Sequence, residues 1–164
     1  MFREMRRKNQ ALTEEECVKI LKSGTSGVLA VDGDDGYPYA VPLSYVYHDG
    51  KIFFHCAESG HKLDAIRRNP KASFCVIGKD QVVPQEYTSY FRSVIVFGKV
   101  RLLESDAEKW DALRLLAQKY YPEASAQEHE QSIRHDYAPV CIVELTVERM
   151  TGKEAAELAQ KKRR

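Results

Sequence analysis

The chain has 164 residues, of which 43% are hydrophobic and 30% are charged, and its formal net charge is +1 at pH 7. This length and composition indicate one soluble domain, which we expect to span residues 1–164, with residues 1–10 and 153–164 peripheral or frayed. A chain this close to neutral gives no electrostatic reason to expect nucleic acid or a membrane surface as a partner.

The N-terminal residues and the four cysteines indicate a cytoplasmic protein. Residues 1–10 lack the apolar stretch of a signal peptide, and no apolar run approaches the roughly 20 residues that cross a bilayer. Cys17, Cys56, Cys75 and Cys141 lie in apolar stretches, and none of them forms a C-x-x-C pair. We therefore expect reduced thiols in the core, and no Cys/His spacing predicts a metal site.

The first half of the chain predicts two helices that flank three strands. Thr13 and Glu16 have the spacing of a capping box, in which a hydroxyl and a carboxylate satisfy free amides at a helix start. Turn residues bound several short apolar runs, as is typical of strands and hairpins. The predicted elements are a helix over 13–23, strands over 26–32, 37–47 and 51–57, and a helix over 60–69 that ends at Asn69 and Pro70.

The second half predicts three more strands and two long helices. Ser105 with Glu108 and Ser125 with Glu128 repeat the capping-box spacing. Strands are expected over 71–78, 88–104 and 139–150, helices over 106–120 and 125–135, and a helical tail beyond residue 152. Six β-rich runs with peripheral helices predict a mainly β fold, a small barrel with helices packed outside. The 106–120 helix carries a stripe that is typical of core packing, formed by Trp110, Leu113, Leu116, Ala117 and Tyr120.

Two prolines, Pro38 and Pro42, lie within the predicted strand 37–47. Proline cannot donate to a sheet ladder, so this strand is an edge, a bulge, or a place where a ligand replaces a neighbouring strand. Backbone groups left free near Pro42 could meet the donor and acceptor edge of a flat heterocycle. An ordinary irregular edge strand explains the two prolines equally well.

The tetrapeptide Ser59-Gly60-His61-Lys62 stands where the 60–69 helix begins. Helix N-termini leave amide groups unpaired and carry partial positive charge, so they favour anions. We expect Ser59 to be the N-cap and Gly60 to allow close approach, while His61 and Lys62 add donors for a phosphate. A capped helix with two solvated side chains is the alternative.

Taken together, four segments resemble the FMN-binding split β-barrel superfamily of pyridoxamine 5′-phosphate oxidase, and within it the nitroimidazole-resistance (Nim-like) family. The segments, in chain order, are YPYAVPLSYVY (37–47), IFFHCAESGHK (52–62), RSVIVFGKVRLLE (92–104) and ERMTGKEA (148–155). The resemblance implies a split β-barrel homodimer that binds FMN at the interface between its two subunits.

The resemblance also implies roles for individual residues. His61 and Lys62 match positions that hold the FMN phosphate, with Ser59 nearby, and His55 matches a histidine that faces the cofactor pocket. Ser93 matches a position near the flavin, and the segment along the isoalloxazine ring comprises Val41, Pro42, Leu43 and Ser44.

One departure from the pyridoxamine phosphate oxidases concerns the strand that matches residues 39–44. Those enzymes carry an Arg at its start and a Lys at its end, where this chain has Tyr39 and Ser44. Two cations are thus missing from the flavin and substrate region. An oxidase of vitamin B6 is therefore not expected, and the electronic tuning of the flavin should differ.

The expected function is FMN-dependent reduction of small nitro or aromatic compounds, with NAD(P)H as the expected class of electron donor. Strand alternation places His55 on the same face as Phe53, where an imidazole needs a polar partner and could give a proton to the substrate. A non-catalytic flavin or haem binder is the alternative, with His55 or His61 as the axial ligand of a haem.

Overall fold

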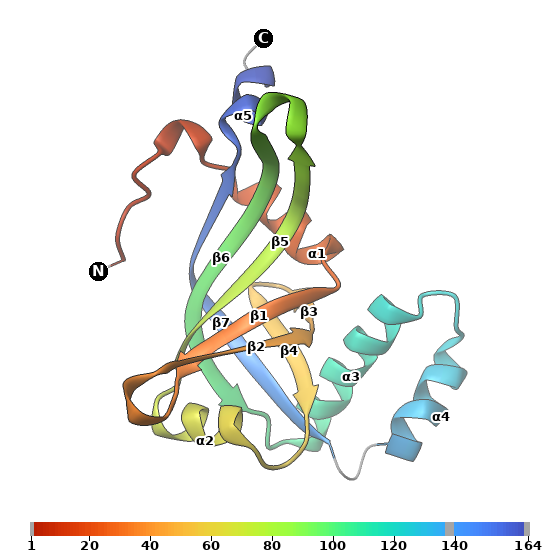
Figure 1. Ribbon diagram of the computed structural model, residues 1–164. Coiled ribbons are helices and arrows are strands. Elements are labelled where there is room, and N and C mark those ends of the chain that lie inside the picture. The colour runs from red at the N-terminus through yellow and green to blue at the C-terminus, as the bar shows by residue number, and fades with distance from the viewer. Residues whose placement is uncertain (1, 137–139, 163–164) are drawn as a thin grey trace.

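The computed structural model describes residues 2–136 and 140–162, and within them seven strands form one antiparallel sheet. The strand order is β2-β1-β5-β6-β7-β4-β3, and the sheet rolls up around a single core (Figure 1). Side chains from most of the strands meet in that core, among them the fully buried Leu29, Phe54, Phe74, Val94 and Leu145. The prediction of a mainly β, split-barrel fold with at least six strands is confirmed.

The elements have the following bounds. The strands are β1 (Ser26–Asp32), β2 (Pro38–Ser44), β3 (Val46–His48), β4 (Lys51–Cys56), β5 (Lys71–Val83), β6 (Thr88–Leu102) and β7 (Cys141–Glu154). The α-helices are α1 (Glu14–Ser23), α2 (His61–Arg68), α3 (Asp106–Tyr120), α4 (Ala126–Asp136) and α5 (Ala156–Lys161). None of the helices in the described residues is long and apolar enough to cross a membrane.

The predicted strand 37–47 is interrupted at Tyr45, and its two parts lie on opposite edges of the sheet as β2 and β3. Tyr45 is fully buried, and its hydroxyl donates to the carbonyl of Leu21 at 2.7 Å. Its backbone amide donates to the hydroxyl of Tyr120 at 2.9 Å instead of to a neighbouring strand. These contacts turn the chain at Tyr45, and the edge position that Pro38 and Pro42 predicted for β2 is confirmed.

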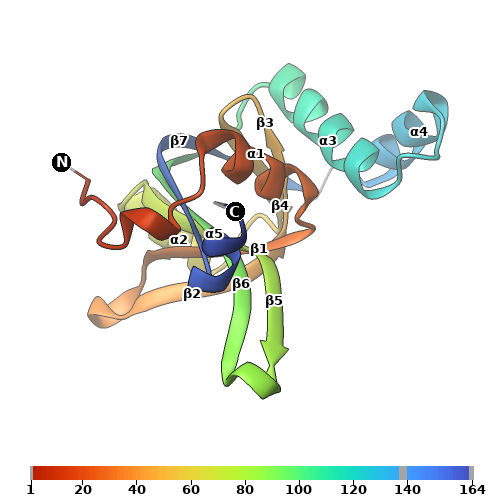
Figure 2. The same ribbon diagram turned by 90° about the horizontal axis from the view of Figure 1, so that it is seen from above.

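The β5–β6 hairpin is longer than predicted and extends beyond the barrel (Figure 2). β5 continues past residue 78 to Val83, with a register shift between Ile77 and Lys79. β7 continues to Glu154, whose buried carboxylate pairs with Arg92 at 3.0 Å and with Lys162 at 2.9 Å. These ion pairs hold the segment that follows residue 152 against the base of the hairpin.

The helices pack outside the barrel, as expected. α1 and α2 bury apolar side chains in the main core, and α2 closes one end of the barrel (Figure 1). α3 buries Ala112 and Leu116 against Phe53 and Ile142 in a second, smaller cluster. α3 and α4 extend to one side, so a space bounded by both helices opens next to β4.

Two of the three predicted capping boxes are present. The Thr13 hydroxyl accepts from the Glu16 amide at 3.2 Å, and the Glu16 carboxylate accepts from the Thr13 amide at 2.9 Å. Ser125 and Glu128 form the same reciprocal pair at 2.8 and 3.3 Å.

The third predicted box, at Ser105, is wrong. Ser105 is the N-cap of α3, but its side chain makes no capping hydrogen bond. The reason lies in Glu108, whose carboxylate accepts from the Arg101 guanidinium at 2.6 Å. An ion pair between β6 and α3 therefore replaces the local pairing that the spacing predicts.

These caps lead to a matched pair of stability predictions. Thr13→Ala should lower the free energy of unfolding by about 1 kcal/mol, because an amide donor at the start of α1 loses its acceptor. Ser105→Ala should change it by less than about 0.5 kcal/mol, because no capping bond is lost. Urea unfolding of both variants measures the difference, and equal losses would contradict this assignment of the caps.

Candidate functional site

The start of α2 forms an open corner beside the barrel. The N-cap is Gly60, with φ at 136°, and no side chain caps the helix there. The prediction of Ser59 as the N-cap is therefore wrong, because the chain turns at Gly60 in a conformation that favours glycine. Ser59 and Gly60 are both exposed, so the start of the helix faces solvent.

The two basic side chains of this corner, those of His61 and Lys62, have different surroundings. The imidazole Nε2 of His61 lies 3.4 Å from the Asp34 carboxylate, and its ring packs on Tyr39 with 4.2 Å between the centroids. Lys62 is half-buried, and its ammonium has no hydrogen-bond or ion-pair partner among residues 2–136 and 140–162. Lys62 is therefore the cation that remains available to an anion at this helix start.

Asp34 holds the corner in place from the β1–β2 connection. Its carboxylate accepts from the Arg68 guanidinium at 2.7 Å. This hydrogen bond from Arg68 keeps the pKa of Asp34 below its ordinary value. Asp34 contacts the first turn of α2 through His61 and the last turn through Arg68. It therefore fixes α2 against the connection between β1 and β2.

The four residues predicted to follow a flavin ring divide between two faces of β2. Val41 and Leu43 are half-buried and pack against the barrel core, whereas Pro42 and Ser44 are exposed on the outside. β2 pairs with β1 alone, so its other edge is open. A ligand along this strand could therefore contact the backbone of the open edge and the side chains of Pro42 and Ser44.

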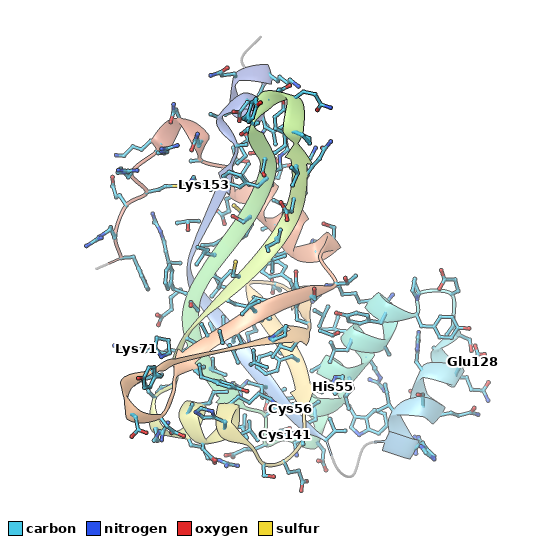
Figure 3. All side chains as sticks on the ribbon, in the orientation of Figure 1. His55, Cys56, Lys71, Glu128, Cys141 and Lys153 are labelled. Carbon is cyan, nitrogen blue, oxygen red and sulfur yellow. The ribbon has the colours of Figure 1, made fainter. Side chains whose placement is uncertain are left out.

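His55 lies at the end of β4, where Figure 3 shows it between the barrel and α3. Phe53 packs against α3 and Phe54 enters the main core, so the predicted alternation that places Phe53 and His55 on one face is confirmed. His55 itself is exposed. It faces an open cavity and not a packed layer of phenylalanines.

That cavity, of about 570 Å³, lies between the end of β4 and the helices α3 and α4. Its walls are mostly apolar, with Leu113, Leu116 and Ile133 among them, and His55 and Ser44 stand at one side. No lysine or arginine of the described residues lines it. The apolar stripe of α3, which the sequence indicated as core, therefore forms part of a cavity wall. A helix face that packs in a core and one that lines a cavity have the same spacing of apolar residues.

The fold places Ser93 away from the predicted site residues of β2. It is half-buried on β6, and β1 and β5 lie between β6 and β2 in the sheet. Three strand spacings amount to about 14 Å. A single chain therefore does not bring Ser93 to the strand that carries Pro42.

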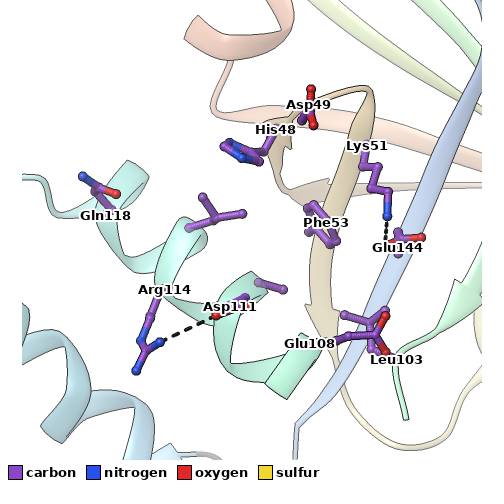
Figure 4. A pocket seen from close by; sticks show the side chains of 12 residues that line it. His48, Asp49, Lys51, Phe53, Leu103, Glu108, Asp111, Arg114, Gln118 and Glu144 are labelled. Atoms are coloured by element: carbon purple, nitrogen blue, oxygen red, sulfur yellow. Dashed lines mark hydrogen bonds and ion pairs between the residues drawn. The ribbon is translucent and has the colours of Figure 1, made fainter. Parts of the chain in front are cut away.

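A second cavity, of about 530 Å³, lies on the other side of α3 (Figure 4). The buried Glu144 carboxylate accepts from Lys51 at 3.0 Å and from Arg101 at 2.9 Å. Burial alone would raise the pKa of Glu144, but hydrogen bonds from Arg101 and Lys51 outweigh it and lower the pKa. Because Arg101 also pairs with Glu108 of α3, this network ties the helix to the sheet.

Metal ligands are not clustered in the described residues. Residues 2–136 and 140–162 contain no group of three or more His, Cys, Asp or Glu side chains that could hold a metal ion.

The sequence of residues 13–154 matches the family model of pyridoxamine 5′-phosphate oxidase. The chain belongs to the pyridoxamine 5′-phosphate oxidase family. The match spans the corner at α2, the open edge of β2, His55 and most of the four segments that carried the resemblance. The resemblance to this superfamily is therefore confirmed.

Individual relatives of this family member include an uncharacterized protein and a protein named for FAD binding. A segment of 94 residues is 31% identical to the uncharacterized protein RA0666 of Rhizobium meliloti (strain 1021) and covers 57% of each chain. A FAD-binding protein of Mesorhizobium loti is 27% identical over 90% of this chain and 98% of its own, with a TM-score of 0.65.

The fold also matches a Bacteroides thetaiotaomicron structure named for 5-nitroimidazole antibiotic resistance. That structure is 22% identical, covers 88% of this chain and 86% of its own, and has a TM-score of 0.73. At this identity the match shows a shared fold.

Proposed function

We propose that this member of the pyridoxamine 5′-phosphate oxidase family binds FMN and reduces small nitro or aromatic compounds. The observation that carries the proposal is Lys62, a half-buried ammonium without a partner among the described residues, at the open start of α2. A charge in this position is stabilised when an anion binds. Tyr39 of β2 packs on His61 at this corner, and Ser44 of β2 lines one cavity together with the exposed His55.

The donor set fits a flavin mononucleotide. Lys62 and the first amides of α2 would hold the phosphate, since a helix start favours anions and Gly60 presents no side chain. Pro42 and Ser44 on the outside of β2 would face the ring system, with free backbone groups of the open edge beside them. When bound, FMN supplies the electrons, and the protein supplies position and proton donors.

The cavity beside His55 indicates the kind of substrate. Its walls are mostly apolar and carry no lysine or arginine among the described residues, so they suit an uncharged ring compound. The imidazole of His55 would meet a polar group of that compound, such as a nitro oxygen. NAD(P)H is the proposed donor and would bind transiently at the open face, because the sequence has no G-x-G-x-x-G motif to hold it.

A spectroscopic titration tests the proposal. The protein should bind FMN and show a flavin band near about 450 nm, which anaerobic NAD(P)H should bleach and a nitroimidazole should restore. Failure to bind any flavin would overturn the proposal. A Soret band near about 400 nm after addition of haem would favour the alternative, a haem binder with His55 as the axial ligand.

A second copy of the chain is the partner that we propose for the outer sheet face, formed by Val28, Pro42, Cys75, Ile95 and Phe97. Pro42, Val28, Cys75 and Ile95 are directly opposed on four neighbouring strands, which makes one apolar row across the sheet. Val28, Ile95 and Phe97 are 36%, 41% and 38% exposed. Such a face needs cover, and a twofold dimer could also bring Ser93 of one subunit toward the flavin of the other.

The dimer can be tested with one charge on that face. Wild-type protein should scatter light as a dimer at micromolar concentration, and Ile95→Glu should shift it toward the monomer mass of 18.8 kDa, because a buried, unpaired carboxylate disfavours the interface. Tyr37→Glu is the control, since Tyr37 is 76% exposed in the β1–β2 connection and lies outside the row. A wild-type monomer with FMN bound would refute the dimer.

A further inference from the structure

Cys56 and Cys141 form a pair of thiols at one end of the barrel. They are directly opposed in register on the antiparallel strands β4 and β7. Their side chains are in hydrogen-bonding contact and point into the same end of the core, and Figure 3 shows them next to each other. Both thiols are free and half-buried, in contrast to the fully packed Cys17.

The geometry of this pair suits a disulfide. Directly opposed residues of antiparallel strands have Cα atoms about 4.5–5.5 Å apart, and disulfides span Cα separations of about 4.4–6.8 Å. A bridge therefore requires rotation of two side chains and no rearrangement of the sheet. Cys75 lies on the outer face of β5, opposite Val28 and Ile95, so its strand neighbours offer no thiol.

We propose that Cys56 and Cys141 are a redox modification site, at which a low-molecular-weight disulfide oxidises the two thiols to a reversible cross-strand disulfide. In the first step the thiolate of one cysteine attacks a sulfur of the small disulfide, forms a mixed disulfide and releases one small thiol. The second cysteine then attacks the protein sulfur and releases the second small thiol. The small disulfide is reduced to two thiols, and these carry the two protons that the cysteines lose.

The surroundings of the two thiols make this reaction slow. Burial raises the pKa of Cys56 to about 11, while the charge of Lys62 opposes that rise. Little thiolate of Cys56 exists at neutral pH, so attack by this thiol on an oxidant is slow. Thiol–disulfide exchange runs in both directions, so an added dithiol reverses the modification.

The bridge would also act on the candidate corner, and this consequence rests on the proposed function. Cys56 directly precedes the exposed residues 57–60, which lead to Lys62 at the start of α2. A bridge that fixes one end of this loop reduces the conformational freedom that the loop would otherwise lose when FMN binds. FMN should then bind the oxidised form more tightly, on the order of two- to tenfold, as expected for one immobilised side chain.

The test uses oxidised glutathione on the full-length protein. Prolonged incubation should lower the intact mass by about 2 Da, the two hydrogens lost in the balanced reaction, and peptide mapping should join Cys56 to Cys141. The melting temperature should rise by on the order of 5–10 °C, and dithiothreitol should reverse both changes.

Matched variants separate this pair from the other cysteines. Cys56→Ser and Cys141→Ser should each abolish the bridge and the thermal shift, whereas Cys17→Ser and Cys75→Ser should preserve both. A bridge between other cysteines, or a lasting mixed disulfide on Cys56 or Cys141, would overturn the proposal. If the bridge forms but FMN affinity is the same in both forms, the modification site stands and its coupling to the corner is refuted. If the bridge forms and FMN does not bind either form, the proposed function fails instead.

Discussion

Replacing Lys62 with alanine is expected to weaken FMN binding by about 1.5–3 kcal/mol, roughly a 10- to 150-fold rise in Kd. The ammonium of Lys62 has no competing partner among the described residues, so a bound phosphate would form its charge-assisted hydrogen bond. His61 contributes less, because Asp34 already lies 3.4 Å from its Nε2 atom. Lys62→Met should weaken binding as much as the alanine variant, since it keeps the aliphatic stem and removes the charge.

Two controls identify the phosphate as the group that Lys62 contacts. Riboflavin lacks the phosphate, so its affinity should be nearly the same in wild type and both Lys62 variants. Arg67→Ala removes the same charge from the other end of α2, where Arg67 is exposed and pairs with Asp64 at 3.3 Å. Arg67→Ala should leave FMN affinity within about twofold, because a cation at a helix C-terminus lies away from the anion site. Fluorescence titration measures all of these affinities, and equal losses for FMN and riboflavin would show that Lys62 does not contact phosphate.

Local patterns in the sequence predicted much of this fold because local forces decide those features. Prolines exclude β2 from the middle of a sheet whatever surrounds it, and the strand lies at the edge. The capping pairs at Thr13 and Ser125 form between residues three positions apart, so no distant contact is needed.

The failures occur where a distant residue captures a group that the local pattern assigns elsewhere. Tyr120 binds the backbone of Tyr45 across 75 positions and interrupts a strand whose composition is continuous. Arg101 takes Glu108 away from Ser105, although these two residues have the spacing of a capping box. Spacing alone contains no information about such partners.

The candidate site likewise contains features that local residues determine and features that other parts of the chain determine. The start of α2 and the open strand were predictable because glycine, lysine and proline act through their own backbone or charge. The cavity beside His55 was not predictable, because α3 has the same apolar stripe whether it covers a core or lines a hollow. Its position depends on α3 being held to the sheet by Arg101, Glu108 and Glu144, a network that joins three separate segments of the chain.

His55→Ala is expected to slow substrate reduction by ~10²-fold, the low end for loss of a general acid, while the fold and most of the FMN affinity remain. The imidazole is exposed at the end of β4, shares a cavity with Ser44, and has no polar partner among the described residues. A group in this position can reach a compound in the cavity, and imidazole gives up a proton readily at working pH. Because His55 is not part of the packed core, its removal leaves no buried cavity in the barrel.

The substitution His55→Gln separates proton donation from shape and hydrogen bonding. Glutamine can donate a hydrogen bond, but it cannot give up a proton, so this variant should be nearly as slow as His55→Ala. His48→Gln is the matched control, because His48 is exposed at the end of β3 and lines the cavity on the other side of α3. Stopped-flow reoxidation of the reduced, FMN-loaded protein by a nitroimidazole measures the step directly. A wild-type rate in both His55 variants at full FMN occupancy would make His55 a surface residue of the barrel. Loss of FMN from both would make it a cofactor ligand, and the proton would then come from water.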